Sequence, residues 1–171
     1  MNQEANSINR ALLEVQSQLE YLTDQLPEGT YAESLDILNG NSIGKHCRHI
    51  LEAFENMESG LPNGTVDYEN RKRQIIYEVD PDAFIERLAK LIRNLSKAEK
   101  STPLKVRHEP FPDQLDAQEF KSSLGRELLF NMEHMIHHMA IIRLAATHQN
   151  LDNCLLPEFG IAFSTLNYQN K

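Results

Sequence analysis

The sequence has few cysteines, no long apolar run and no basic leader, and each absence excludes a class of protein. Cys47 and Cys154 are its two cysteines, and no CxxC pair exists. A disulfide framework is therefore not expected, and a reducing cytoplasm is the default location. No stretch approaches the roughly 20 apolar residues that a membrane span needs. Residues 1–6 also lack the basic-then-apolar layout of a signal peptide, so we expect a cytoplasmic protein without a membrane partner.

The chain also lacks the basic surface that nucleic-acid binding requires. Its formal net charge is -8, whereas a nucleic-acid binder normally shows a basic patch that neutralises phosphates. The one basic cluster, residues 71–73, follows Asp67 and Glu69 and so belongs to a mixed-charge loop. We expect no nucleic-acid partner.

Motifs of several enzyme classes are missing as well. The sequence has no HExxH zinc motif, and its histidine-bearing helices have no ExxH signature of di-iron bundles. It has no GxGxxG, phosphate-binding loop or GxSxG motif either. A zinc site built from cysteines would need more cysteines than the chain has. What remains to explain is a group of histidines.

Apolar residues recur at helical spacing in four segments, near residues 4–26, 42–57, 81–100 and 122–148. Ser42 and Asp80 are typical N-cap residues, and Pro81 suits the first position of a helix. With 171 residues, of which 40% are hydrophobic, the chain suffices for one domain over residues 1–171. The pattern predicts an all-α four-helix bundle with two long crossover connections. Alternation at 104–108 predicts a short strand, and we expect the tail, residues 151–171, to pack on the bundle.

Five of the seven histidines lie on two predicted helices. His46 and His49 lie on the second helix, and His134, His137 and His138 lie on the last. Imidazole is the commonest side-chain metal ligand and binds as the neutral base. Two ligands from one helix and one from another would leave coordination positions open, as at reactive rather than structural metals.

Helix geometry ranks the histidines of the last helix. His134 and His138 are i, i+4 neighbours and lie one above the other on the flank of the apolar stripe. His137 points further toward the polar side. Glu127 and Asn131 lie on the same flank as the pair, where they could orient a ligand or substrate. Periodicity thus favours His134 and His138 as ligands.

Periodicity is less decisive on the second helix, where the apolar stripe lies slightly closer to His46 than to His49. The alternative is that these histidines are ordinary core or surface residues hydrogen-bonded to neighbours. Metal ligands must converge in space, and spacing along the chain does not show convergence. Both interpretations stay open at this point.

Four segments resemble motifs of the DinB-like superfamily. Residues 42–51 are similar to its second-helix motif, and residues 123–129 followed by His134-x-x-x-His138 are similar to its last-helix motif. Residues 66–71 and 157–162 resemble connecting and tail motifs of one bacterial branch. The resemblance implies a four-helix bundle, often a homodimer, with a divalent metal held by His49, His134 and His138. His46 is the substitute for His49.

The resemblance also implies a function. Some superfamily members are similar to thiol-dependent transferases, which implies a metal-dependent thiol S-transferase or hydrolase that acts on a small-molecule substrate. Zinc, nickel, iron or manganese would fit histidine ligands, and the co-substrate would be a low-molecular-weight thiol. Glu127 and Asn131 are the weak catalytic candidates. The alternative is a non-catalytic dimeric bundle, a stress-related or binding module, whose site is degenerate or structural.

Overall fold

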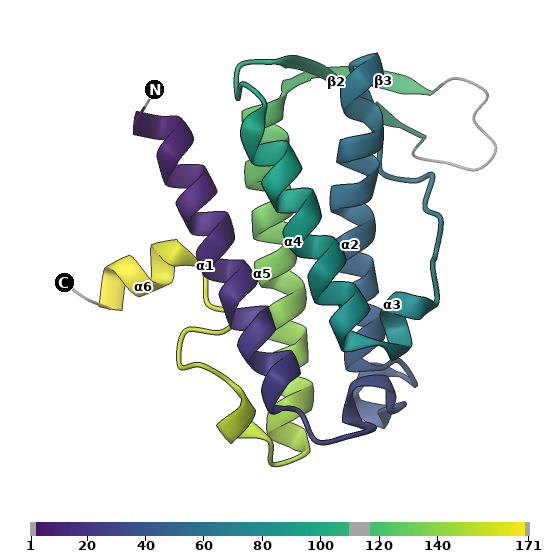
Figure 1. Ribbon diagram of the computed structural model, residues 1–171, viewed down its shortest axis with the longest axis vertical. Coiled ribbons are helices and arrows are strands. Elements are labelled where there is room, and N and C mark those ends of the chain that lie inside the picture. Colours follow the sequence, from purple (N-terminus) through teal and green to yellow (C-terminus); the bar gives the residue numbers. More distant parts are fainter. Residues whose placement is uncertain (1–2, 110–116, 170–171) are drawn as a thin grey trace.

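Four long helices lie side by side and form most of the molecule (Figure 1). The computed structural model describes residues 3–109 and 117–169. The long helices are α1 (Gln3–Gln25), α2 (Ile43–Gly60), α4 (Pro81–Lys97) and α5 (Leu124–His148). Helices α1 and α2 each pack against both α4 and α5, so the four enclose one core. None of the described helices is long and apolar enough to cross a bilayer.

Local capping explains where three of these helices begin. The side chain of Ser42 accepts a hydrogen bond from the backbone N–H of Lys45 at 3.0 Å. Asp80 caps α4 through the N–H of Ala83 in the same way, and Ser123 caps α5. Each cap satisfies a backbone donor that has no partner within the helix. The helix starts predicted at Ser42 and Asp80 are confirmed.

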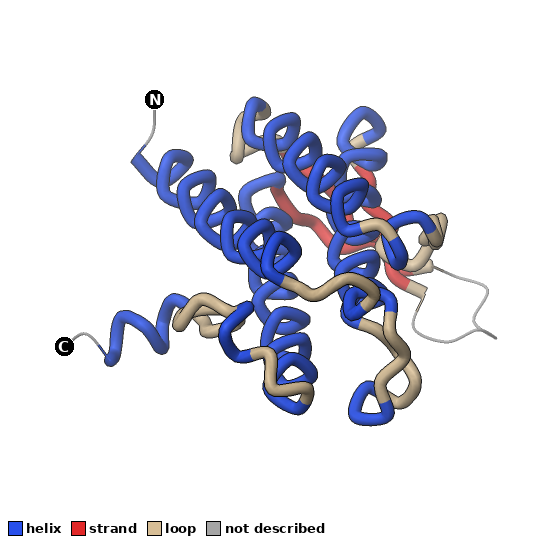
Figure 2. The backbone as a smooth tube through the Cα atoms, turned by 60° about the horizontal axis from the view of Figure 1, so that its bottom comes forward, coloured by secondary structure: helices blue, strands red, loops and turns tan. Residues whose placement is uncertain are grey.

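A small sheet makes the all-α prediction wrong in one respect. Strands β1 (Thr65–Asp67), β2 (Pro103–His108) and β3 (Gln118–Ser123) pair in the order β1-β2-β3 (Figure 2). β1 runs parallel to β2, with Val66 opposite Val106, and β2 runs antiparallel to β3. Only the strand at 104–108 was predicted, because β1 is too short for a pattern and β3 is mostly polar. β3 leads directly into α5, so the sheet lies at the start of the histidine helix.

The first crossover contains a short helix that the polar sequence did not predict. α3 (Ile76–Val79) lies against α2 and α4. The Tyr31 hydroxyl donates to the carbonyl oxygen of Tyr77 at 2.8 Å. Gly44 permits the close approach, because a Cβ at this position would lie 2.1 Å from the carbonyl oxygen of Glu78. The crossover is therefore held against the same helix that carries His46 and His49.

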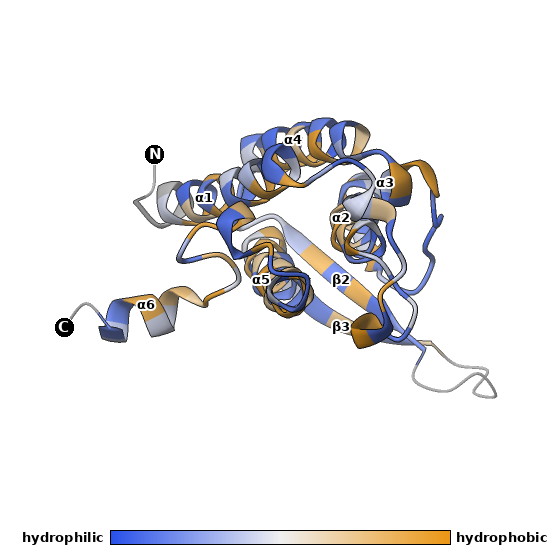
Figure 3. Ribbon diagram, turned by 90° about the horizontal axis from the view of Figure 1, so that it is seen from below, coloured by the Kyte–Doolittle hydropathy of each residue, from blue (hydrophilic) through white to orange (hydrophobic). Residues whose placement is uncertain are grey.

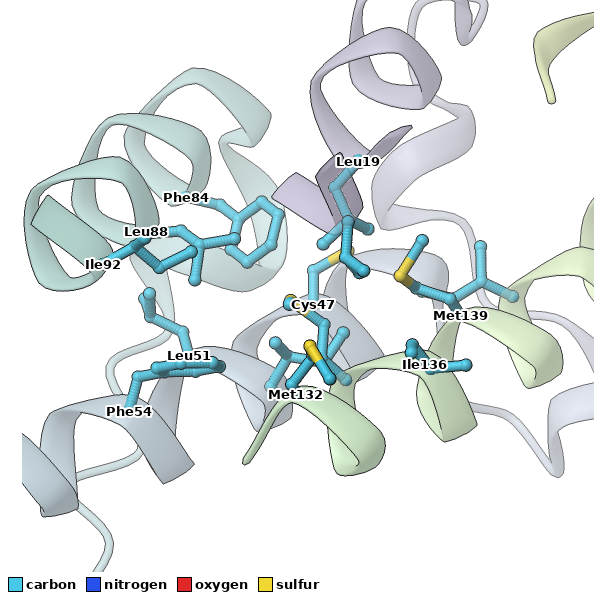
Figure 4. Packing of buried hydrophobic residues seen from close by; sticks show 14 of the residues in the cluster. Leu19, Cys47, Leu51, Phe54, Phe84, Leu88, Ile92, Met132, Ile136 and Met139 are labelled. Carbon is cyan, nitrogen blue, oxygen red and sulfur yellow. The ribbon is translucent and has the colours of Figure 1, made fainter. Parts of the chain in front are cut away.

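The buried core lies between the four long helices, and the apolar sides of these helices face one another (Figures 3 and 4). Phe54, Phe84 and Leu88 are fully buried within it. The tail joins this core in part: Phe159 is fully buried. The last helix, α6 (Phe163–Gln169), has no buried residue. Short 3-10 helices complete the described connections: η1 (Thr30–Ala32), η2 (Asp36–Leu38), η3 (Leu61–Asn63) and η4 (Asp152–Cys154).

Candidate metal centre

Helices α2 and α5 pack against each other, and three histidines meet between them. His49, His134 and His138 each offer a ring nitrogen, and these nitrogens lie within 4.8 Å of one another. The ring centroids are 5.1 Å apart for His49–His134 and 4.6 Å apart for both other pairs. Two nitrogens that bind one ion at about 2 Å each lie at most about 4 Å apart. The three rings are therefore near the spacing that a shared ion requires.

His46 lies beside this triad rather than in it. Its Nδ1 is 3.0 Å from the Nδ1 of His138, which leaves the Nε2 of His138 free for another partner. His137 is exposed, with its ring centroid 5.5 Å from that of His138. Periodicity favoured His46 over His49, but the way α2 packs on α5 puts His49 with the pair.

The electrostatic surroundings keep the triad neutral. Burial lowers the pKa of His138 to about 3, with further lowering by His134 and His49. Burial likewise lowers the pKa of His49 to about 4, and nearby His134 and Arg71 add to the effect. The pKa of His134 is lowered too, first by burial and then by His137. At neutral pH the rings are thus free bases, the form that binds a metal.

The buried carboxylate of Glu52 and the guanidinium of Arg71 both lie close to the Nδ1 of His49. The Nη1 of Arg71 is 2.8 Å from the Nδ1 of His49. Oε2 of Glu52 is 3.7 Å from the same Nδ1, and the Glu52 side chain is 3% exposed. Oε1 of Glu52 is ion-paired with Arg48 at 2.6 Å, whereas Oε2 has no hydrogen-bond partner.

Glu127 and Asn131, the two weak catalytic candidates, are fully buried and share one partner. The Tyr68 hydroxyl donates to Oε2 of Glu127 at 2.8 Å and accepts from Nδ2 of Asn131 at 2.8 Å. Ser122 and Arg126 donate to the other oxygen of Glu127. Burial and then the charge of Glu127 raise the pKa of Tyr68, so its hydroxyl stays protonated. Sequence reasoning did not assign a role to Tyr68, and the only signal was its place in the 66–71 motif.

Two adjoining pockets open beside the triad. The first, of about 310 Å³, has His49, His134, Arg71 and Tyr68 in its wall. The Phe130 ring, also in that wall, stacks on His134 at 14° with 6.1 Å between centroids. The second pocket, of about 500 Å³, shares its Tyr68, Glu69 and Phe130 walls with the first. Its remaining lining comes from the sheet and the start of α5: Val106, Arg107, His108, Phe120, Lys121, Ser122, Arg126 and Glu127.

Comparison with known proteins gives a family and one longer relative. The model of the DinB family matches residues 1–147. A protein of Rhizopus delemar named FK506-binding protein 5 is 30% identical over 150 residues, which are 84% of this chain and 37% of that protein. The chain therefore spans well under half the length of that relative. No solved structure matches the chain.

Proposed function

The chain belongs to the DinB family, and from this premise we propose that it is a metal-dependent enzyme on a four-helix-bundle scaffold. His49, His134 and His138 would hold one divalent ion. The observation that carries the proposal is the convergence of three ring nitrogens within 4.8 Å at the wall of a pocket. The reaction would be thiol S-transfer or hydrolysis of a small molecule.

The donor set fits such an ion. Three neutral imidazoles leave the charge of a divalent cation uncompensated and leave coordination positions open. Imidazole ligands suit zinc, nickel, iron or manganese. When bound, such an ion would acidify an adjacent water or thiol and so make a nucleophile available near neutral pH.

The chain's own residues would bind and orient the substrate. Tyr68 and Phe130 form the wall between the pocket at the triad and the pocket over the sheet. Glu127 and Asn131 hydrogen-bond to the Tyr68 hydroxyl, which supports a positioning role for them. Arg71 reaches the pocket at the triad, and Lys121 lines the other without an ion-pair partner among the described residues. These cations favour an anionic small molecule, such as a thiol that carries a carboxylate.

A non-catalytic module is the second candidate, and one observation favours it. His138 pairs with His46, and His49 pairs with Arg71. Such pairs are what a degenerate site would keep, because they satisfy the half-buried rings. A homodimer and a cytoplasmic location remain predictions under either function.

The metal content of the purified protein and of two variants tests the proposal. We expect about one ion per wild-type chain and loss of most of it in His138→Ala. His137→Ala is the matched control, since it removes the exposed neighbour on the same helix and should keep the ion. Equal metal in both variants, or none in the wild type, would overturn the assignment. A folded structure that chelation leaves intact, with only a small fall in melting temperature, would favour catalysis over a structural role.

A further inference from the structure

Glu52 presents toward a candidate ligand a buried oxygen that makes no hydrogen bond, with the guanidinium of Arg71 3.7 Å away. Its side chain is 3% exposed, and Oε2 has no hydrogen-bond partner although it lies 3.7 Å from the Nδ1 of His49. A buried acceptor without a donor costs about 1–3 kcal/mol and more when charged. The other oxygen is occupied by Arg48, so Oε2 alone faces the histidine. A donor on His49 Nδ1 would satisfy it.

The contact with Arg71 requires the other tautomer of His49, in which Nδ1 carries no proton. The Nη1 of Arg71 is 2.8 Å from the same Nδ1, and a guanidinium only donates. Nδ1 must therefore accept, and the ring proton must lie on Nε2. That tautomer puts an N–H on the nitrogen that faces away from Arg71 and Glu52, where a metal needs a lone pair.

We propose that Glu52 is the positioning residue of His49 and that Arg71 competes with it for the Nδ1 of that ring. This inference rests on the proposed function, because it concerns how His49 serves the ion. An ion on Nε2 would displace the proton from that nitrogen, and the neutral ring would then carry its proton on Nδ1, where it would donate to Oε2 of Glu52. Arg71 would have to leave Nδ1, since two donors do not pair. A carboxylate behind a ligating histidine fixes its tautomer and orientation in the same manner.

The partial exposure of Arg71 permits this move. Its side chain is 33% exposed, and the crossover segment that carries it, residues 68–74, lies between β1 and α3. Its guanidinium also lies 3.7 Å from Oε2 of Glu52, so a small shift keeps it beside the carboxylate. It lines the pocket at the triad and would then turn toward that space.

Substitution of the two residues should change zinc affinity in opposite directions. Glu52→Gln keeps an oxygen for Arg48 but turns an amide N–H₂ toward His49, so affinity should fall about 10- to 100-fold. Arg71→Ala removes the competing donor, so affinity should rise about 5-fold, the equivalent of one ordinary hydrogen bond. Matched controls separate these effects from charge alone.

The controls carry the same charge changes without contact to His49. Glu55→Gln neutralises another carboxylate of α2, one that pairs with Arg87. Lys72→Ala removes a cation from the same loop. Both should shift zinc affinity by no more than about 2-fold, because Glu55 is already paired with Arg87 and Lys72 is an exposed charge that salt screens. Equal losses in Glu52→Gln and Glu55→Gln, or equal gains in Arg71→Ala and Lys72→Ala, would overturn the proposal.

The tautomer itself can be read by ¹⁵N NMR of the His49 ring in the wild-type protein, whatever the variants do. We expect the proton on Nε2 in the metal-free protein and on Nδ1 after zinc addition. An unchanged tautomer in protein that binds one zinc would refute the role of Glu52 and leave the metal site standing. Failure to bind any of zinc, nickel, iron and manganese would instead refute the proposed function.

Discussion

Tyr68→Phe removes one oxygen from the buried network behind the pocket. The hydroxyl donates to Oε2 of Glu127 and accepts from Nδ2 of Asn131, each at 2.8 Å. Glu127 and Asn131 are both fully buried, so a replacement partner would have to be a water that enters from the pocket lined by Tyr68 and Glu127. The substitution leaves the phenyl ring, and hence the packing, in place.

The free energy of unfolding of the Tyr68→Phe protein should be about 2–4 kcal/mol lower than that of the wild type. An orphaned buried carboxylate oxygen costs about 1–3 kcal/mol, and the lost bond from Asn131 adds about 1 kcal/mol. Asn131 keeps its bond to the carbonyl oxygen of Glu127 at 2.8 Å, which limits the second contribution. The loss is a large share of the 5–15 kcal/mol that typically stabilises a domain.

Urea unfolding of the metal-free protein measures this loss directly. Tyr168→Phe is the control, because Tyr168 is 80% exposed and its substitution should cost less than about 0.5 kcal/mol. Zinc affinity should stay within about 3-fold of wild type, since the hydroxyl is not a ligand. A Tyr68→Phe protein as stable as the control would refute the network. If the Tyr68→Phe protein were as stable as wild type but no longer bound zinc, Tyr68 would instead have a role at the ion.

Two further predictions concern the triad and the crossover. Folding lowers the pKa of His49 to about 4 and that of His138 to about 3. In the unfolded chain both histidines have the ordinary pKa of about 6.5, so below that pH the unfolded chain binds more protons than the folded one. Metal-free protein should therefore lose stability as pH falls from about 6.5 toward 4, by about 1–2 kcal/mol at pH 5 once partial exposure is allowed for. Urea midpoints at pH 7 and pH 5 measure this, and equal midpoints would contradict it. Gly44→Ala should cost at least about 2 kcal/mol, because its Cβ would lie 2.1 Å from the carbonyl oxygen of Glu78 and 2.6 Å from the Tyr31 ring; an unchanged thermal midpoint would show that the crossover is not held there.

The four long helices were predictable from sequence because their determinants are local. Helical hydrogen bonds join residues four apart, and caps such as Ser42 and Asp80 act on a donor three residues later. The sheet was not predictable in the same way. β1 pairs with a strand about 40 residues further along the chain, and a three-residue strand carries no periodicity of its own. Only tertiary structure decides such a pairing.

The sequence by itself determined which histidines share a helix face, since spacing of i, i+4 places His134 above His138 whatever the rest of the fold does. It also supplied the family: three of the four motifs that resemble the DinB-like superfamily lie within residues 1–147, the part that the family model matches. Which histidine of α2 meets that pair was decided by the tertiary structure, because the rotation and depth of one helix against another follow from the packing of the whole core. The same holds for the contacts of Glu52 and Arg71 with His49, which join residues from a helix and a distant loop.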